Sequence, residues 1–322
     1  MTVVFPCDPD RPEQPDAAFA HEVAAARAVG LPVGVVDHDA AARGEVDLAL
    51  RHAPRGPGPV AYRGWMLRAA RYAALHAGLV ARGLSPLTSP SAYATGHHLP
   101  RWYPQLAAFT PRSVWVEGEP LLARAVEAVR AFGDAALIVK DFVKSEKHLW
   151  EAACFVPRAD DAAALERVVR RFLAERGADL EGGLVLREFV PLERVGEHPR
   201  SGMPISVEAR AFLLEGAPVH VLPYWEGTAA RVPPPPIASF LPSLRGLGSP
   251  FLAVDLARRA DGEWLLLEVG DGQVSGLPED ADPAPLFLAL ARCLRRLGPR
   301  GSEEPRRARG DGPAARSDPS DR

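Results

Sequence analysis

Two carboxylates in apolar surroundings are the residues of this chain best suited to chemistry. Asp255 lies in the run Phe251–Ala257 and Glu268 lies in the run Trp264–Val269, with an Asp-Gly pair between the two runs. That spacing predicts a β-hairpin. A buried acid is unfavourable unless it is paired, hydrogen-bonded or bound to a metal. Two of them before the segment GDGQVSG therefore suggest a site for a hard cation; the alternative is a hairpin whose two acids face solvent.

Basic residues form a second group. Lys140 ends the apolar run ALIVK, and Lys144 and Lys147 follow it in a polar segment. A lysine at a strand end can hold phosphate oxygens as a compact point charge. Arg210 follows Glu208 by two residues in SVEARAFLL, so the two side chains share one face of a strand. Such an arginine would stabilise the charge of phosphoryl transfer, or else form an ion pair that contributes little.

Two arginines are candidates for binding a substrate. Arg63 precedes a helical pattern that runs from Trp65 to about residue 83, where a basic side chain opposes the helix dipole and suggests an anionic ligand. The alternative is a surface arginine. Arg101 lies in the connector 85–112, which is rich in proline and aromatic residues and is predicted to be a hinge or a substrate-covering loop. The neighbouring His97 and His98 lack the i, i+4 spacing of a helical metal pair.

The elements that must position these residues follow from periodicity and from turn signals. Alternating strand and helix patterns predict an α/β segment at the N-terminus, with apolar runs at 2–7, 31–37 and 46–52 and a helix at 16–29. A small α+β lobe is predicted next, with helices at 120–132 and 160–177 and strands at 135–141, 150–157 and 183–190. Strands at 207–214 and 219–225, the hairpin and a helix at 285–297 complete the pattern.

Composition excludes several classes of protein. The 322 residues carry a net charge of −3, which does not favour a nucleic-acid groove or a membrane surface. The three cysteines lack any CxxC spacing, and the N-terminus lacks the pattern of a signal peptide. No apolar run approaches the ~18 residues of a membrane helix. We therefore expect a cytoplasmic protein with neither nucleic-acid nor membrane partners; nothing in the sequence indicates its oligomeric state.

Taken in order, these residues resemble the ATP-grasp superfamily. The order is a lysine at a strand end, the segment REFVPLE about 50 residues later, E-x-R on a strand, and then an Asp and a Glu across a hairpin that ends in ExGDGQVSGLP. The resemblance implies two α+β lobes that clasp ATP, preceded by an α/β domain. Its domains would be 1–112 with the connector, a small lobe at 113–190, a large lobe with the metal site at 191–298, and a disordered tail at 299–322.

The resemblance also implies roles for residues. Lys140, with Lys144 and Lys147, would bind the ATP phosphates. Glu188 and Val190 would contact adenine through their backbone, and Glu193 would bind ribose. Asp255 and Glu268 would hold Mg²⁺, which commonly uses one or two carboxylates together with substrate phosphates.

Two positions depart from the superfamily pattern. Many members have Asn at the position of Gly270 and Arg at the position of Ala253. Asp271 is predicted to supply the missing metal ligand, and Arg210 or Arg231 the missing positive charge.

The function predicted from these features is an ATP- and Mg²⁺-dependent ligase that joins a carboxylate to an amine or a similar nucleophile through an acyl phosphate and releases ADP. Lys140 and Arg210 would be its catalytic residues, and its substrates would be small molecules or peptides. Two alternatives stay open: an ATP-binding module without catalysis, and a nucleotidyltransferase similar to nucleic-acid ligases. A dinucleotide loop at GDGQVSG is disfavoured, because the spacing G-x-G-x-x-G is absent.

Overall fold

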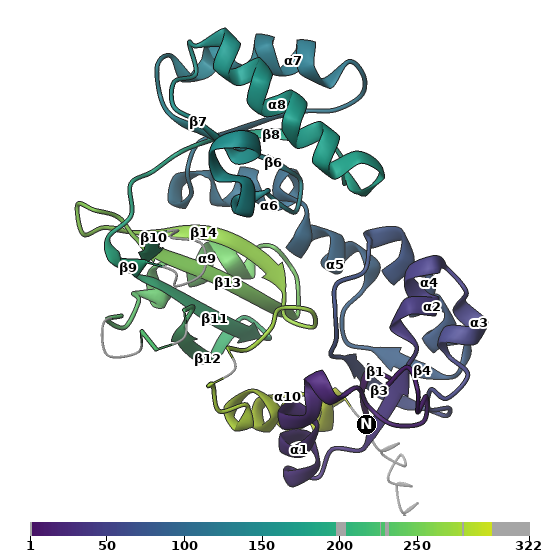
Figure 1. The fold of residues 1–322 in the computed structure, drawn as a ribbon. Helices are drawn as coiled ribbons and strands as arrows, with labels where there is room; N and C mark the ends of the chain where they lie inside the picture. Colours follow the sequence, from purple (N-terminus) through teal and green to yellow (C-terminus); the bar gives the residue numbers. More distant parts are fainter. Residues whose placement is uncertain (1, 198–203, 226, 229–231, 279, 298–322) are drawn as a thin grey trace, which may run out of the picture.

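The computed structural model describes residues 2–197, 204–225, 227–228, 232–278 and 280–297. Within them, three four-stranded sheets and one two-stranded sheet form the framework, and each four-stranded sheet has its own covering helices (Figure 1). The sheets follow one another along the chain, and each large sheet lies within one predicted segment. The domain boundaries themselves stay a prediction. The predicted tail at 299–322 and Arg231 lie outside the described residues.

The N-terminal sheet is parallel and has the order β2-β1-β3-β4. Its strands are β1 (Thr2–Pro6), β2 (Val33–Val36), β3 (Gly58–Tyr62) and β4 (Leu84–Pro86). Its helices are η1 (Ala17–Phe19), α1 (Ala20–Ala28), α2 (His38–Arg43), α3 (Val46–Ala49) and α4 (Ala69–Ala81). The apolar run at 46–52, predicted as a strand, begins with helix α3. Short apolar runs do not distinguish a strand from a buried helix, and here Ala49 packs into the core of this domain.

The connector is helical, so the prediction of a loop was wrong. It contains α5 (Pro90–His97), α6 (Leu99–Leu106) and η2 (Ala107–Phe109). Ser89 caps α5 by accepting a hydrogen bond from the backbone N–H of Ala92, and Pro90 occupies the first turn. Proline is tolerated in a first turn because the N–H that it lacks has no partner in the helix there. The prolines that suggested a loop therefore mark helix starts.

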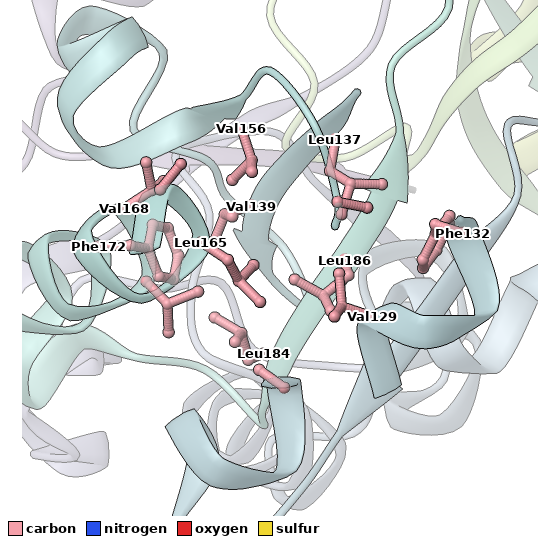
Figure 2. Packing of buried hydrophobic residues seen from close by; sticks show 14 of the residues in the cluster. Val129, Phe132, Leu137, Val139, Val156, Leu165, Val168, Phe172, Leu184 and Leu186 are labelled. Atoms are coloured by element: carbon pink, nitrogen blue, oxygen red, sulfur yellow. The ribbon is translucent and has the colours of Figure 1, made fainter. Parts of the chain in front are cut away.

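The small lobe is an antiparallel sheet of order β5-β8-β6-β7 with two helices on one face. Its strands are β5 (Ser113–Val116), β6 (Leu137–Asp141), β7 (Phe155–Val156) and β8 (Leu184–Glu188). Its helices are α7 (Leu121–Ala128), η3 (Val129–Phe132), η4 (Lys147–Leu149), the π-helical turn η5 (Trp150–Cys154), α8 (Ala162–Arg176) and η6 (Gly177–Asp179). The predicted strand at 150–157 is thus a π-turn followed by two strand residues. Figure 2 shows how Leu165 and Phe172 of α8 pack with Leu137, Val139 and Leu186 of the sheet.

The large lobe is an antiparallel sheet of order β12-β11-β13-β14, and the predicted hairpin provides β13 and β14. Its strands are β11 (Glu208–Leu214), β12 (Ala217–Pro223), β13 (Phe251–Arg258) and β14 (Trp264–Asp271); β9 (Arg194–Glu197) and β10 (Pro204–Ser206) form the separate pair. Its helices are η8 (Ile237–Ser239), α9 (Leu241–Arg245) and α10 (Ala284–Leu297).

Each face of this sheet packs against different elements. One face shares a core with α10 and the N-terminal domain, through Phe212, Phe287 and Phe5. The opposite face packs against α6 and α9, through Val254, Trp102 and Leu244. The connector helices therefore lie between the lobes, as Figure 1 illustrates. None of the helices in the described part of the chain is long and apolar enough to cross a membrane.

Candidate functional site

Three charged side chains line up across the large-lobe sheet. The strand register places Arg210 of β11 opposite Asp255 of β13, and Asp255 opposite Glu268 of β14. Residues directly opposite one another in a sheet point to the same face. The Arg210 guanidinium donates to both carboxylate oxygens of Asp255, from Nε at 2.8 Å and from Nη2 at 2.9 Å. The two predicted metal acids and the predicted arginine thus form one charged row.

A β-bulge orients the third member of this row. Asp255 pairs with Glu268, whereas the next residue, Leu256, pairs with Leu266, so β14 contains one extra residue between them. Without it, Leu266 and Glu268 would share a face, because side chains alternate along a strand. With it, Leu266 enters the core and Glu268 lies beside Asp255. The apolar pattern of the sequence gives no signal for this insertion.

An ion pair joins the two lobes at this row. Lys140, at the end of β6 in the small lobe, is only 4% exposed, and its Nζ lies 2.6 Å from Glu268 Oε1. Burial raises the pKa of Glu268, but the positive charges of Lys140 and Lys147 lower it by more, so the pKa is below its usual value. Glu268 is therefore an ionised carboxylate that faces a lysine across the cleft.

Lys147 belongs to the same electrostatic cluster. Its side chain keeps contact with solvent, yet the surrounding protein desolvates the ammonium, which lowers its pKa; the charges of Glu268, Glu208 and Asp255 among others raise the pKa by more. Glu208 accepts a hydrogen bond from Trp225 Nε1 at 3.1 Å, and burial raises the pKa of its carboxyl. The cleft thus pairs positive groups from the small lobe with acids from the large lobe.

Arg210 is held firmly. Besides Asp255, it donates through Nη1 to the carbonyl oxygen of Gly276 at 2.9 Å, and its guanidinium lies 4.7 Å from the centre of the Tyr224 ring. Burial lowers its pKa, but the charge of Asp255 raises it by more, so the guanidinium stays fully charged. Because Gly276 follows GDGQVS, Arg210 also anchors that loop.

Asp141 fixes the loop that follows Lys140, a role that sequence reasoning missed. Its buried carboxylate accepts hydrogen bonds from the backbone N–H groups of Val143 and Lys144 and from Arg176 Nε at 3.0 Å. Its position directly after Lys140 was the available signal. The side chain of Lys144 is exposed on this loop, and the structure does not bring it to the charged row.

Arg187 is a second residue that sequence reasoning missed. It lies on β8, is 6% exposed, and donates from Nη2 to Thr110 Oγ1 at 2.7 Å, while its Nε is buried without a hydrogen-bond partner. Burial lowers its pKa to about 10, and the field of Glu268 acts in the opposite direction. This buried cation therefore lies close enough to the cleft to interact with Glu268. In the sequence it is visible only as a charge inside an apolar strand.

The predicted adenine segment leaves the sheet as expected. Glu188 ends β8, and its N–H donates to the carbonyl oxygen of Arg112 at 2.8 Å. The N–H and C=O of Val190 have no hydrogen-bond partner within the described residues. Val190 is therefore free to contact a planar ligand edge, whereas the N–H of Glu188 is not. The Glu193 carboxylate lies 3.0 Å from Arg258 Nη1 at the surface.

Comparisons with known proteins agree with this arrangement. Residues 131–290 match a family model described as an "ATP-grasp domain", family 3 of its clade, and this range contains Lys140, Arg210, Asp255 and Glu268. The chain belongs to the ATP-grasp superfamily. This outcome confirms both the resemblance and the predicted fold class.

Solved structures with the ATP-grasp fold align over most of the chain. A RimK domain ATP-grasp protein from Sphaerobacter thermophilus DSM 20745 aligns with a TM-score of 0.59 and 14% identity, covering 92% of this chain and 100% of that one. The ATP-grasp ligase PsnB, complexed with precursor peptide PsnA2 and AMPPNP, aligns with a TM-score of 0.54 and 16% identity (91% and 97% covered). D-cycloserine synthetase DcsG aligns with 0.53 and 19% (90% and 99% covered). No curated protein sequence matches the chain.

In this ATP-grasp protein, Asp271 does not join the predicted metal ligands. It pairs with Leu252 on the face of the sheet opposite Asp255, and it is fully buried. Its Oδ1 accepts hydrogen bonds from the N–H and the Nε2 of Gln273, and burial raises its pKa to about 7. No group of three His, Cys, Asp or Glu side chains that could hold a metal occurs among the described residues. The structure therefore corrects the role predicted for Asp271.

The missing side chain at Gly270 has a structural counterpart. A Cβ added to Gly270 would lie 2.8 Å from Ser275 Oγ, and this hydroxyl donates to the carbonyl oxygen of Asp271 at 2.9 Å. Ser275 thus occupies the space that a side chain at position 270 would need. A larger residue there would require the GDGQVS loop to move.

Arg63 connects two domains instead of facing an open anion site. It is 1% exposed and forms an ion pair with Glu22, and its Nη1 donates to the carbonyl oxygens of Gly272 and Ser275. These contacts correct the prediction that Arg63 serves a substrate. Arg101 is exposed on α6, away from these contacts.

The two adjacent histidines have separate partners. His97 Nδ1 donates to the carbonyl oxygen of Tyr93 at 2.8 Å, and His98 Nε2 lies 2.9 Å from Glu181 Oε1. Burial lowers the pKa of His97 to about 4. Both side chains thus take part in holding the connector helices.

Proposed function

We propose that this ATP-grasp protein is an ATP- and Mg²⁺-dependent ligase that joins a carboxylate to an amine or a similar nucleophile. The observation that carries the proposal is the charged row Arg210–Asp255–Glu268, which faces Lys140 across the two lobes. Phosphoryl transfer requires mainly positioning and charge neutralisation, and this cleft contains fixed positive groups on one side and two acids on the other.

The proposed reaction has two balanced steps. First, a carboxylate oxygen of one substrate bonds to the γ-phosphorus of ATP, and ADP leaves. Second, the amine nitrogen of the other substrate bonds to the acyl carbon, phosphate leaves with the electron pair of the broken C–O bond, and the nitrogen loses a proton. Neither step needs a covalent bond to the protein.

The positive residues have distinct roles in this scheme. Lys140 and Lys147 neutralise the ATP phosphates from the small lobe, and Arg210 does so from the large lobe. Arg187 adds a buried positive charge near Glu268, and Lys144 extends the positive loop at the surface. The free N–H of Val190 contacts adenine with the backbone C=O of Glu188, and Glu193 exchanges Arg258 for the ribose hydroxyls.

Asp255 and Glu268 are the residues that would hold Mg²⁺. Their carboxylates lie side by side in the sheet register, and hard oxygen ligands of this kind suit Mg²⁺ when substrate phosphates supply the rest. When bound, the ion would screen the negative charge of the phosphates. Arg210 and Lys140 now balance these acids, so their charges become available to phosphate oxygens when the acids bind the cation.

The structural neighbours support the choice of reaction class and of substrates. PsnB is described as a ligase complexed with a precursor peptide, and DcsG as a synthetase. We therefore propose a peptide or a small molecule as substrate. We also propose that the protein works in the cytoplasm, where the free thiols of Cys7, Cys154 and Cys293 would remain reduced.

One experiment tests the metal half of this proposal. We expect the double variant Asp255→Asn with Glu268→Gln to lose Mg²⁺-dependent ATP binding by at least about 100-fold in Kd, because both metal ligands lose their charge. Glu193→Gln should retain Mg²⁺ dependence, so it serves as a control in the same lobe. Unchanged Mg²⁺-dependent binding in the double variant would refute the metal assignment.

The products separate the ligase from its alternatives. With ATP, Mg²⁺ and a pool of amino acids and peptides, the ligase should release ADP. AMP release, or an AMP adduct on Lys140 in an intact mass spectrum, would instead indicate a nucleotidyltransferase. The bidentate pairing of Asp255 with Arg210 and the absence of a side chain at Gly270 favour the second candidate, an ATP-binding module. Thermal stabilisation by ATP and Mg²⁺ without turnover would identify that module.

A further inference from the structure

The carboxyl edge of the N-terminal sheet is the place where an open parallel sheet usually binds a ligand. In the order β2-β1-β3-β4, the chain leaves β1 towards one side to form β2 and later forms β3 on the other side. The strand order thus reverses between β1 and β3. Ligands of such sheets bind outside the carboxyl ends at this reversal. Nothing in the proposed ATP site uses this edge.

Three aromatic side chains gather there, one after each of the first three strands. Trp65 follows β3 and is 42% exposed. Its ring centre lies 5.0 Å from that of Phe19, which follows β1, and 5.4 Å from that of His38, which follows β2. We refer to Phe19, His38 and Trp65 as the aromatic patch. An indole held between two rings at a solvent-exposed edge is a preformed surface for a planar or cationic group.

Hydrogen bonding fixes which nitrogen of His38 is free. The Tyr62 hydroxyl donates its only proton to the carbonyl oxygen of Trp65 at 2.9 Å. The contact of 3.1 Å between that hydroxyl and His38 Nδ1 is therefore a hydrogen bond only if Nδ1 carries the proton. Nε2 of the neutral ring is then an acceptor, and it has no partner in the part of the chain that the structure describes.

The charged groups around the patch are acidic. Burial lowers the pKa of His38, and the carboxylates that act against this shift are Asp39 and Asp37. The same two acids and Asp8 act on Cys7, at the end of β1. The nearby cation, Arg63, is already paired with Glu22 inside the protein. The surroundings therefore favour a positively charged ligand over an anion.

The patch is connected to the proposed cleft through the GDGQVS loop. Gly64, directly before Trp65, donates its N–H to the carbonyl oxygen of Gln273 at 3.0 Å. Three residues further on, Gly276 accepts the hydrogen bond from Arg210. A molecule bound on Trp65 thus lies beside the loop that leads to the charged row.

We propose that the aromatic patch binds the amine substrate, and that this substrate carries a positive charge. The Trp65 ring would contact the cationic group, and His38 Nε2 would accept a hydrogen bond from an N–H of the ligand. The inference rests on the proposed ligase function for its place in the reaction, but the binding itself is independent of ATP.

Binding of defined probes tests the inference. The full chain without nucleotide is titrated with L-arginine amide and L-lysine amide, and with N-acetyl-L-glutamate as the anionic comparison, by ligand-observed NMR. We expect saturable binding of the two cationic amides, and Kd values at least fivefold higher for Trp65→Ala. Asp39→Asn, at an exposed position, should weaken binding two- to threefold, and added salt should reduce that difference. Trp65→Phe keeps a ring and should give an intermediate Kd.

His76→Gln is the matched control, because His76 is a half-buried histidine on α4 of the same domain whose pKa burial also lowers. It should leave the Kd unchanged, whereas His38→Gln should raise it severalfold. Equal binding of the amides and N-acetyl-L-glutamate, or equal Kd values for Asp39→Asn and the unaltered chain, would overturn the proposal even if Trp65→Ala failed to fold.

The two proposals fail separately. If the amides do not bind while Asp255→Asn with Glu268→Gln abolishes Mg²⁺-dependent ATP binding, the aromatic patch is not the amine site and the ATP site stands. If the amides bind to the patch but ATP and Mg²⁺ do not bind to the chain, the cation site stands and the ligase function fails.

Discussion

Glu268 and Asp271 are acids on one strand, three residues apart, and their surroundings differ in every respect that matters for charge. Glu268 faces the cleft, where Lys140 contacts it and Lys147 and Arg187 act on it. Asp271 points to the other face and has only hydrogen bonds from Gln273 and the more distant field of Arg63. The pKa of the first is lowered, and that of the second is raised to about 7.

The difference separates a binding role from an assembly role. Cations that ligands can displace or share surround the acid in the cleft, so it is suited to metal and phosphate. The buried acid on the other face holds Gln273, and the Gln273 amide in turn donates to the Tyr72 hydroxyl at 3.1 Å, in the N-terminal domain. One strand thus uses its two faces for two purposes.

Asp271 should make stability depend on pH. Its pKa is near its ordinary value of 3.8 in the unfolded chain and about 7 in the folded chain, so the folded chain binds the proton more tightly. Its contribution to the free energy of unfolding is therefore largest below about pH 4 and falls as pH rises towards 7, by about 2 to 3 kcal/mol between pH 5 and pH 8.

Urea unfolding of the unaltered chain and of Asp271→Asn at pH 5 and pH 8 measures this contribution. Asparagine keeps the acceptor oxygen but cannot ionise, so the variant should lack this part of the pH dependence. Glu268→Gln is the informative comparison, because a lowered pKa has the opposite sign: its stabilisation is lost as pH falls. Identical pH profiles for Asp271→Asn and the unaltered chain would remove the contrast between the two acids.

The sequence predicted the elements whose signals are local. The hairpin of β13 and β14 follows from two apolar runs and an Asp-Gly turn, and α8 begins at the Asp161 cap and ends before Gly177. Lys140 was placed at its strand end by the same logic. The order of these residues along the chain was enough to identify the superfamily, because each residue type has a defined chemical role.

The sequence did not predict what depends on register. The face of Asp271 follows from its pairing with Leu252, and the alignment of Glu268 with Asp255 depends on a bulge of one residue. Neither leaves a compositional trace, since apolar residues flank both acids. Arg63 is a similar case: its partner Glu22 lies 41 positions earlier, and only tertiary packing brings them together.

Removing the charge of Glu268 should cost stability through its partner. Glu268→Gln leaves Lys140 almost fully buried without a carboxylate, and breaking such a pair costs about 3 to 5 kcal/mol in dry surroundings. The Glu268 side chain is 37% exposed, so water screens the pair and we expect about 1 to 2 kcal/mol. Lys140→Met in the same chain should recover most of the loss, because the stranded ammonium is gone.

A double-mutant cycle by urea unfolding measures this coupling. Additive effects of Lys140→Met and Glu268→Gln would mean that the two lobes are not joined by this pair. Asp271→Asn is the control from the opposite face: it strands no cation, because Arg63 keeps its ion pair with Glu22.

The smallest effect is expected at the surface pair of Glu193 and Arg258. The two side chains are 40% and 34% exposed, and exposed pairs contribute only about 0.2 to 1 kcal/mol. Glu193→Gln should therefore change the free energy of unfolding by about 0.5 kcal/mol or less, while raising the Kd for ATP if Glu193 holds the ribose hydroxyls. Urea unfolding and calorimetric titration with ATP separate these two quantities. A large loss of stability without a change in Kd would make Glu193 a structural residue like Asp271, and would place the boundary between binding and assembly on the cleft side of this pair.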